Sequence, residues 1–483
     1  MANVNITIDG KQLSVPAGMT ILAAAKANDI YIPTLCFLEK LDPHASCRMC
    51  VVEVEGARTF QHACAAKVRE GMVVHTNTEA VRASRKMTLQ LLLSDHSVDC
   101  HHCLRLGNSK CDDLDPKFCE MCFFCDCVKD GFCDLQALAR EYQVDVLPFS
   151  QKHNTKLIDR SSVIVRNPNK CVKCKRCVDV CGKVQTVHNL AVSGRGSEVI
   201  IGPAFGKRMS ESDCVGCGRC VDVCPTGAIY VREHKDETIY YAHKYGETTM
   251  AQISESILPE LQKLTKLDRR YVSVATVAAG MKKIGFDYVV REDAAAAQAM
   301  HQGTAQMKAA LAEAKGTVIL TNSPAAEKFL AREFPELHVI VYPSAQQIFH
   351  DQARSFAKER GVDLSHLYLA NLTNFNENAA EAEENDTVDF VINARELHRI
   401  FLRTGVDLRR IRPVQPDEMV EIPEETAYAK LFEAASWTMD TEPESFTLEA
   451  DGKKLRCAIC HNLGQARKVL TAGKCYDVIR VIA

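Results

Sequence analysis

The sequence predicts a multidomain protein of the α+β and α/β classes, and three observations predict this. The 483-residue chain has 23 cysteines, of which twenty lie before residue 225 and none lies between 225 and 456. Alternating apolar residues open the chain, as in a half-buried strand. From about residue 238, helical patterns alternate with short apolar runs, which is typical of α/β layers. The length suggests about three domains.

Composition excludes several classes of protein. The formal net charge of -3 argues against nucleic-acid binding. The chain has no apolar run of about 18 residues, so we expect no membrane span. The amino-terminal residues lack the form of a secretory signal. So many cysteines in such a chain indicate metal binding rather than disulfides, and a reducing cytoplasm as the setting.

The first elements are short strands and one helix. Residues 4–8 alternate, and the turn pair Asp9-Gly10 leads into a second strand near 13–15. Thr20 is placed to cap a helix over 21–28. Four cysteines then follow, and a close pair flanked by one distant cysteine on each side suits a [2Fe–2S] cluster. The gaps differ from the plant-type run, and four free thiols are the alternative. These residues are Cys36, Cys47, Cys50 and Cys64.

The next element is a predicted helix over 79–94, and a ligand-like pattern follows it. His96, Cys100 and Cys103 are spaced as His-x-x-x-Cys-x-x-Cys. One histidine and three cysteines can hold a [4Fe–4S] cluster, and imidazole in place of thiolate reduces the negative charge there. A structural histidine beside unrelated cysteines is the alternative.

Residues 104–132 are unusually rich in cysteine. Four of five closely spaced cysteines are expected to hold a further iron–sulfur cluster, which we favour over a zinc site. Which of the five is spare stays open. They are Cys111, Cys119, Cys122, Cys125 and Cys127.

Two near-identical runs with the spacing C-x-x-C-x-x-C-x-x-x-C follow, and Pro225 directly follows the second. This spacing binds a pair of [4Fe–4S] cubanes, with the fourth cysteine of each run ligating the cluster of the other run. Zinc knuckles are the alternative, but zinc sites usually pair two C-x-x-C units at a longer separation. The runs are Cys171, Cys174, Cys177 and Cys181, and then Cys214, Cys217, Cys220 and Cys224.

The second half contains expected helices and strands but no nucleotide-binding motif. It has neither a G-x-G-x-x-G fingerprint nor a G-x-x-x-x-G-K-[ST] loop. The acidic run 381–386 is expected to be a solvated loop. We expect helices over 250–264 and 296–314, and strands over 271–274, 318–320, 339–341 and 390–392.

Three cysteines near the carboxy-terminal end are left over. Cys457, Cys460 and His461 have the C-x-x-C-H spacing of haem attachment, but that chemistry belongs outside the cytoplasm. A small metal site formed by Cys457, Cys460 and Cys475 is the alternative. Semi-buried thiols on the last α/β unit are the favoured interpretation.

The order of the sites resembles the amino-terminal half of iron-only hydrogenases, and the large iron–sulfur subunit of bacterial NADH dehydrogenase (complex I) begins similarly. Leu93-Ser94-Asp95-His96 and Gly131-Phe132-Cys133-Asp134-Leu135-Gln136 resemble the two halves of the family's histidine-ligated cluster motif. The resemblance implies that Cys133 is the fourth ligand and that 104–132 is an insertion. It also implies that Cys36, Cys47, Cys50 and Cys64 are the [2Fe–2S] ligands.

The second half resembles the hydrogenase catalytic domain without its ligands. Ser344-Ala345-Gln346-Gln347-Ile348-Phe349 is similar to S-P-Q-Q-M-F, and 324–329 and Arg395-Glu396-Leu397 also match. The T-S-C-C-P motif reads Leu320-Thr321-Asn322-Ser323-Pro324, and M-P-C-x-x-K falls on Thr373-Asn374-Phe375-x-x-Asn378. Residues 476–483 resemble the run that enters M-A-C-P-G-G-C. Asn322, Ser323 and Phe375 cannot replace thiolate ligands.

The resemblance implies four domains. These are a β-grasp [2Fe–2S] ferredoxin domain (1–77), a histidine-ligated [4Fe–4S] domain with the cysteine-rich insertion (78–150), a bacterial-type two-[4Fe–4S] ferredoxin domain (151–237) and a degenerate hydrogenase-like α/β domain (238–483). The implied cofactors are one [2Fe–2S] cluster, three [4Fe–4S] clusters and one additional cluster in the insertion.

We therefore expect an electron-transfer subunit of a soluble, NADH-linked, electron-bifurcating complex that is not itself a hydrogenase. The implied partners are subunits that carry FMN, NAD(H) and a small [2Fe–2S] cluster, together with ferredoxin. A further subunit would react with NADP(H), hydrogen or formate. The alternative is a redox or hydrogen sensor, which would predict an output domain that 226–483 does not resemble.

Overall fold

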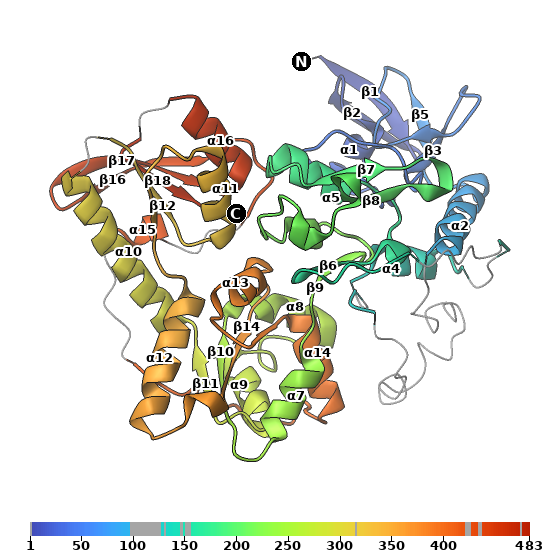
Figure 1. Ribbon diagram of the computed structural model, residues 1–483. Helices are drawn as coiled ribbons and strands as arrows, with labels where there is room; N and C mark the ends of the chain where they lie inside the picture. Colours follow the sequence, from blue (N-terminus) through green and yellow to red (C-terminus); the bar gives the residue numbers. More distant parts are fainter. Residues whose placement is uncertain are drawn as a thin grey trace.

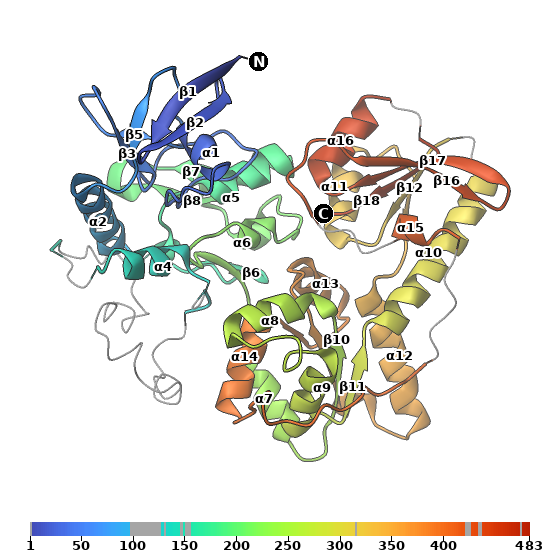
Figure 2. The ribbon, with the colours of Figure 1, turned by 180° about the vertical axis from the view of Figure 1, so that it is seen from behind.

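The computed structural model describes residues 2–96, 127–129, 132–144, 148–149, 156–313, 316–420, 427–432, 437–473 and 476–483. The amino-terminal sheet and the cysteine-rich middle region lie on one side of the molecule, and two α/β lobes lie on the other (Figures 1 and 2). Within the described ranges, no helix combines the length and apolar character needed to cross a bilayer.

The amino-terminal unit is a five-stranded mixed sheet with one helix. Its strand order is β2-β1-β5-β3-β4, with β1 and β5 parallel and the other neighbours antiparallel. The Thr20 hydroxyl accepts a hydrogen bond from the Ala23 amide at 3.1 Å, so the predicted cap is present. The elements are β1 (Asn3–Ile8), β2 (Lys11–Pro16), α1 (Ile21–Lys26), β3 (Val51–Val54), β4 (Gln61–His62) and β5 (Val73–His75).

Two helices pack beneath this sheet. Helix α2 (Glu79–Ser94) has the predicted bounds and is capped by Thr78, whose hydroxyl accepts from the Val81 amide at 3.2 Å. Helix α4 (Asp134–Glu141) begins directly after Cys133. Apolar residues of the two helices share one core, so α4 is held close to the end of α2; they include Leu89, Leu93, Leu135 and Leu138.

The middle region carries the two cysteine runs on short elements. Strands β6 (Ile164–Arg166) and β9 (Ile229–Val231) pair antiparallel, as do β7 (Leu190–Ser193) and β8 (Ile200–Pro203). Helix α5 (Arg176–Asp179) continues into a π-helical turn at Val180–Val184, and α6 (Arg219–Asp222) is its counterpart in the second run. Short 3₁₀ turns lie at Pro168–Lys170, Gly196–Glu198, Ala204–Gly206, Met209–Glu211, Glu255–Ile257 and Leu364–His366.

The carboxy-terminal half forms two lobes, each with its own sheet (Figure 1). The first sheet is entirely parallel, in the order β11-β10-β14-β15, and the second has the order β13-β12-β18-β17-β16 with only β16 antiparallel. The strands are β10 (Thr248–Ile253), β11 (Tyr288–Arg291), β12 (Val318–Thr321), β13 (Val339–Val341), β14 (Leu367–Leu372), β15 (Phe390–Ile392), β16 (Glu444–Ala450), β17 (Lys453–Cys460) and β18 (Val478–Val481).

The chain passes back and forth between the two lobes. Helices α10 and α12 lie side by side and carry the chain from the first sheet to the second and back (Figures 1 and 2). The helices of this half are α7 (Lys235–His243), α8 (Leu258–Thr265), α9 (Val274–Lys283), α10 (Asp293–Glu313), α11 (Pro324–Glu333), α12 (Ala345–Glu359), α13 (Glu377–Asn385), α14 (Ala394–Arg403), α15 (Ala429–Phe432) and α16 (Leu463–Thr471).

Three expectations for this half were wrong. Residues 250–253 belong to strand β10 rather than to a helix, because the strand is buried on both faces and shows no alternation. Residues 271–274 are not a strand but lead into α9, where Ser273 forms a capping box with Thr276. The acidic run is not a solvated loop, since most of it is the end of α13 and Glu381 is only 5% exposed.

Candidate iron–sulfur sites

The four amino-terminal cysteines lie together beside the first sheet. Cys36, Cys47, Cys50 and Cys64 are all buried, and the Cys50 and Cys64 sulfurs are 3.3 Å apart. Hydrogen bonds within the pairs lower the pKa of Cys36 to about 5 and that of Cys50 to about 7. The same hydrogen bonds raise the pKa of Cys47 and of Cys64, so each pair shares one proton and can carry one negative charge. The arrangement fits a [2Fe–2S] cluster.

The backbone of this cysteine loop adopts an uncommon conformation. Arg48, between Cys47 and Met49, has a φ of 57°, in the left-handed region that side chains other than glycine rarely adopt. Ala45 does the same with a φ of 49°. Such conformations concentrate where a loop clamps a ligand.

The structure describes only part of the proposed histidine-ligated site. His96 is buried just after α2, and Cys133 caps α4 by accepting a hydrogen bond from the Gln136 amide at 3.4 Å. Burial raises the pKa of Cys133 to about 12. Cys100 and Cys103 lie outside the described residues. The packing of α2 on α4 brings the two described ends of the motif to the same core.

The proposed insertion site also falls mostly outside the described residues, which leave out Cys111, Cys119, Cys122 and Cys125. Cys127 is described and is buried. Its carbonyl accepts a hydrogen bond from Arg395 of α14. The end of the insertion therefore lies between the proposed histidine-ligated site and the carboxy-terminal half.

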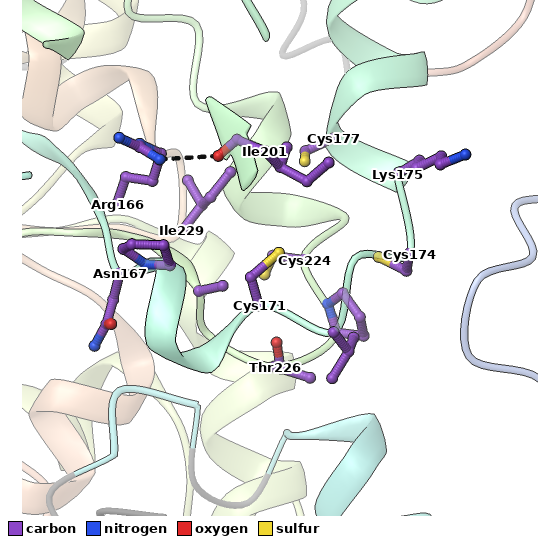
Figure 3. A pocket seen from close by; sticks show the side chains of 14 residues that line it. Arg166, Asn167, Cys171, Cys174, Lys175, Cys177, Ile201, Cys224, Thr226 and Ile229 are labelled. Atoms are coloured by element: carbon purple, nitrogen blue, oxygen red, sulfur yellow. Dashed lines mark hydrogen bonds between the residues drawn. The ribbon is translucent and has the colours of Figure 1, made fainter. Parts of the chain in front are cut away.

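The two cysteine runs cross over in the way that their spacing predicts. One cavity is lined by Cys171, Cys174 and Cys177 of the first run together with Cys224 of the second (Figure 3). Another is lined by Cys214, Cys217 and Cys220 together with Cys181. Each cavity thus receives three cysteines from one run and the last cysteine of the other.

The surroundings of both cavities fit iron–sulfur cubanes. Apolar side chains such as Ile201 and Ile229 line the first, while Lys175 extends away from it (Figure 3). Burial raises the pKa of Cys171 to about 11 and that of Cys174 to about 12. Buried thiolates without a counter-charge are unfavourable, and bound iron would supply that positive charge. An apolar shell excludes water and tunes the potential of a metal centre.

The residues between the cysteines were missed by the sequence reasoning. The runs are identical not only at their cysteines but also at an arginine and an aspartate, Arg176 and Asp179 in the first and Arg219 and Asp222 in the second. Asp179 bonds to Nε2 of His44, which lies in the [2Fe–2S] loop. These repeated residues contact neighbouring units, and their repetition was the signal that could have found them.

The positions matched to the hydrogenase ligand motifs carry oxygen and amide donors. The Ser323 hydroxyl caps α11 and donates to Glu377 Oε2 at 3.1 Å. In the separate segment that is similar to S-P-Q-Q-M-F, the buried Gln346 amide donates to Thr387 at 2.7 Å and accepts from Asn371 at 2.7 Å. Phe375 is 37% exposed. This donor set does not fit an iron–thiolate centre.

The structure does not bring Cys457 and Cys460 together. Both lie on β17 and are fully buried, but they are three residues apart and join different cores, so they face opposite sides of the sheet. Cys475 lies outside the described residues. The two described thiols pack as core residues, and burial raises the pKa of both, to about 11 for Cys457 and about 12 for Cys460.

Three segments of the chain match known protein families. Residues 1–79 match the 2Fe-2S iron-sulfur cluster binding domain, and residues 208–230 match the 4Fe-4S binding domain. Residues 247–482 match the family described as iron only hydrogenase large subunit, C-terminal domain.

Three curated proteins illustrate the range of similarity. The NADP-reducing hydrogenase subunit HndD of Solidesulfovibrio fructosivorans is 31% identical over 100% of this chain and 87% of its own length. Iron hydrogenase 1 of Clostridium pasteurianum is 25% identical over 85% of this chain and 70% of its own length. The mitochondrial NADH-ubiquinone oxidoreductase 78 kDa subunit of Candida albicans is 30% identical, but the match covers 42% of this chain and only 25% of that protein.

Proposed function

Because the chain belongs to the iron-only hydrogenase large-subunit family, we propose that it is the iron–sulfur electron-transfer subunit of an NADH-linked, electron-bifurcating oxidoreductase complex. The observation that carries the proposal is the crossed arrangement of the two cysteine runs around two apolar cavities. Clusters bound there would supply one-electron transfer. The similarity to HndD supports a role in a complex that acts on NAD(P)H.

The chain's own residues would hold and shield the centres. Cys36, Cys47, Cys50 and Cys64 would hold the [2Fe–2S] cluster, and the two crossed cysteine sets would hold two cubanes. His96, Cys100, Cys103 and Cys133 would hold the third [4Fe–4S] cluster. The insertion cysteines would hold an additional one. Apolar side chains around the described cavities would exclude water from the sulfurs.

The carboxy-terminal half would serve as a docking scaffold rather than as a catalyst. Asn322, Ser323 and Phe375 stand at positions matched to thiolate ligands, and none of them can provide a thiolate. A fold can persist when its chemistry is lost. Partner subunits would therefore bind NAD(H) and FMN, and ferredoxin would exchange electrons with the complex. The third redox couple, NADP(H), hydrogen or formate, would react at another subunit.

Anaerobic reconstitution tests this function. The four family sites should bind about fourteen irons, and an additional cluster should add roughly two to four. Electron paramagnetic resonance (EPR) of the reduced protein should show [2Fe–2S] and [4Fe–4S] signals. The isolated chain should evolve no hydrogen from reduced viologen after treatment with the hydrogenase maturation proteins. Far fewer than about twelve irons, or zinc in the two runs, would contradict the cluster assignment. Hydrogen evolution would contradict the non-catalytic role.

Purification of the complex from its native host tests the partners. We expect the chain to copurify with a subunit that contains flavin and binds NAD(H). NADH should then reduce the clusters in the complex but not in the isolated chain. Reduction of the isolated chain by NADH would contradict the placement of the nucleotide site on a partner.

A further inference from the structure

A buried arginine joins the second cysteine run to the carboxy-terminal half. Arg219 lies between Cys217 and Cys220, and only 5% of it is exposed. Its Nε donates to the backbone oxygen of Ala483 at 3.0 Å, and its Nη2 donates to the same oxygen. Its guanidinium carbon lies 5.4 Å from the centre of the Trp437 ring. A cation in this position is fixed and largely removed from water.

Two carboxylates approach this guanidinium. Asp222 Oδ2 accepts from Arg219 Nη1 at 3.2 Å, and Glu377 Oε1 lies 3.8 Å from Nη2. Burial raises the pKa of Glu377, while the Arg219 charge and the hydrogen bond from Ser323 oppose that rise. Arg480 on β18 and Asp222 on α6 are the other charged groups that act on Glu377. Asp222 and Glu377 are therefore the carboxylate side chains that counter the guanidinium charge.

The far end of this network lies on positions matched to lost metal ligands. Ser323, which donates to Glu377 Oε2 at 3.1 Å, stands where the T-S-C-C-P motif has a cysteine. Glu377 lies within the segment matched to M-P-C-x-x-K. A chain of contacts therefore runs from a former ligand position through Glu377 to Arg219.

The first cysteine run contains the equivalent arginine with a different partner. Arg176 Nη1 lies 3.1 Å from Asp134 Oδ2, next to Cys133, and does not share the Glu377 network. The backbone amide of each arginine bonds to the sulfur two residues before it, Cys174 or Cys217. The two arginines therefore form a matched pair, one for each cavity.

We propose that Arg219 raises the reduction potential of the cluster held by Cys181, Cys214, Cys217 and Cys220, and that Glu377, which accepts a hydrogen bond from Ser323, positions Arg219 and partly neutralises its charge. This inference rests on the proposed iron–sulfur function. A buried positive charge favours the reduced, more negative form of a cluster, and local charge is one of the terms that set its potential. Ser323, at a position matched to a thiolate ligand, would thus act on the potential of the neighbouring cubane through Glu377 and Arg219. Arg219 is a positioning residue, since the sulfurs rather than its own atoms hold the cluster.

Redox titration followed by EPR tests this proposal on the reconstituted full chain. In Arg219→Gln, one cubane wave should shift to a lower potential and the [2Fe–2S] wave should not move. Arg219→Lys keeps the charge and should retain most of the parent potential. Glu377→Gln, measured at pH 8, should shift the same wave in the opposite direction. Arg176→Gln is the matched control and should leave that wave in place while it shifts the other cubane.

The outcomes separate this inference from the proposed function. If the parent chain shows no cubane signals, the proposed function fails, and the inference fails with it. If Arg219→Gln binds the parent amount of iron but its cubane waves do not move, the inference alone is overturned. The inference would also be overturned if the cubane potential fell as far in Arg219→Lys as in Arg219→Gln. Packing rather than charge would then be responsible for the shift. If one of the variants Arg219→Gln, Arg219→Lys and Glu377→Gln assembles poorly, the potentials of the other two still test the inference.

Discussion

A Cβ atom placed on Gly218 would lie 2.5 Å from the Cβ of Asn376. Gly218 has a φ of 74°, and its counterpart in the first run is Lys175, with a φ of 66°. The left-handed conformation is therefore compatible with a side chain in one run but not in the other. The difference is that the start of α13 packs directly on the second run, which requires glycine at this point.

Gly218→Ala should consequently destabilise the contact between the second run and the carboxy-terminal half. The added methyl group forces the backbones apart, and overpacking of this kind costs about 1–3 kcal/mol. Gly361→Ala is the control, because Gly361 has a φ of 70° and a methyl group added there would meet no other atom within 4 Å. Unfolding in urea under argon should show the larger loss for Gly218→Ala. Equal losses would mean that backbone strain alone explains the effect.

The crossed cysteine arrangement predicts which substitutions share a phenotype. Cys224→Ser should remove the same cubane signal as Cys171→Ser, although the two residues belong to different runs. Cys181→Ser should instead match Cys214→Ser. Each variant should lose about four irons. EPR and iron analysis check this prediction, with Cys457→Ala as a buried cysteine outside both cavities.

A match between Cys224→Ser and Cys214→Ser would contradict the crossing. Loss of iron from Cys457→Ala would show that general unfolding, rather than loss of a ligand, reduces the iron content.

Local sequence patterns predict the helix that begins at a capping residue and the strands in which apolar and polar residues alternate. Helix α1 and the first strands follow directly from the cap at Thr20 and from alternating residues. The crossing of the cysteine runs agrees with what their spacing alone predicts. These features depend on residues close together in the sequence, so no tertiary information was needed.

The errors arose where burial depends on distant segments. Strand β10 looked helical because neighbouring strands and helices cover both of its faces. The acidic run looked solvated because nothing local shows that the Ser344 hydroxyl donates a hydrogen bond to Glu381. The Arg219 network joins residues from widely separated parts of the chain, including Ala483 and Glu377. Its partners could not be found without the fold.

A second buried arginine should be important for the stability of the amino-terminal unit. Arg85 of α2 is 2% exposed and donates to the Val51 carbonyl at 2.7 Å and to the Tyr142 hydroxyl at 2.9 Å. Arg85→Met would leave the buried Val51 carbonyl without this donor, at about 1–3 kcal/mol, and would remove a donor from the half-buried Tyr142 hydroxyl. The exposed Arg82 of the same helix is the control, and Arg82→Met should change stability by less than about 0.5 kcal/mol. Thermal unfolding of the two variants checks this, and similar midpoints would contradict it.

The carboxyl group of Glu381 should make stability fall as the pH rises. Burial raises its pKa to about 7, with a hydrogen bond from Ser344 acting in the opposite direction. Between about pH 4.5 and 7 the folded protein therefore keeps a proton that the unfolded chain releases, so the stabilisation is complete below this window and is lost as the pH rises through it. The total change should be on the order of 3 kcal/mol.

Glu381→Gln carries no titrating group and should lose this part of the pH dependence. The quantity to measure is the difference in unfolding midpoint between variant and parent at pH 5, 6, 7 and 8 under argon. The unfolding midpoint of the variant should rise relative to that of the parent as the pH rises. The reason is that only the parent must then bury a charge or retain a proton at increasing cost. Glu359→Gln, on the exposed face of α12, should keep the parent's profile. A constant difference between Glu381→Gln and the parent across this range would show that Glu381 is already ionised in the folded protein.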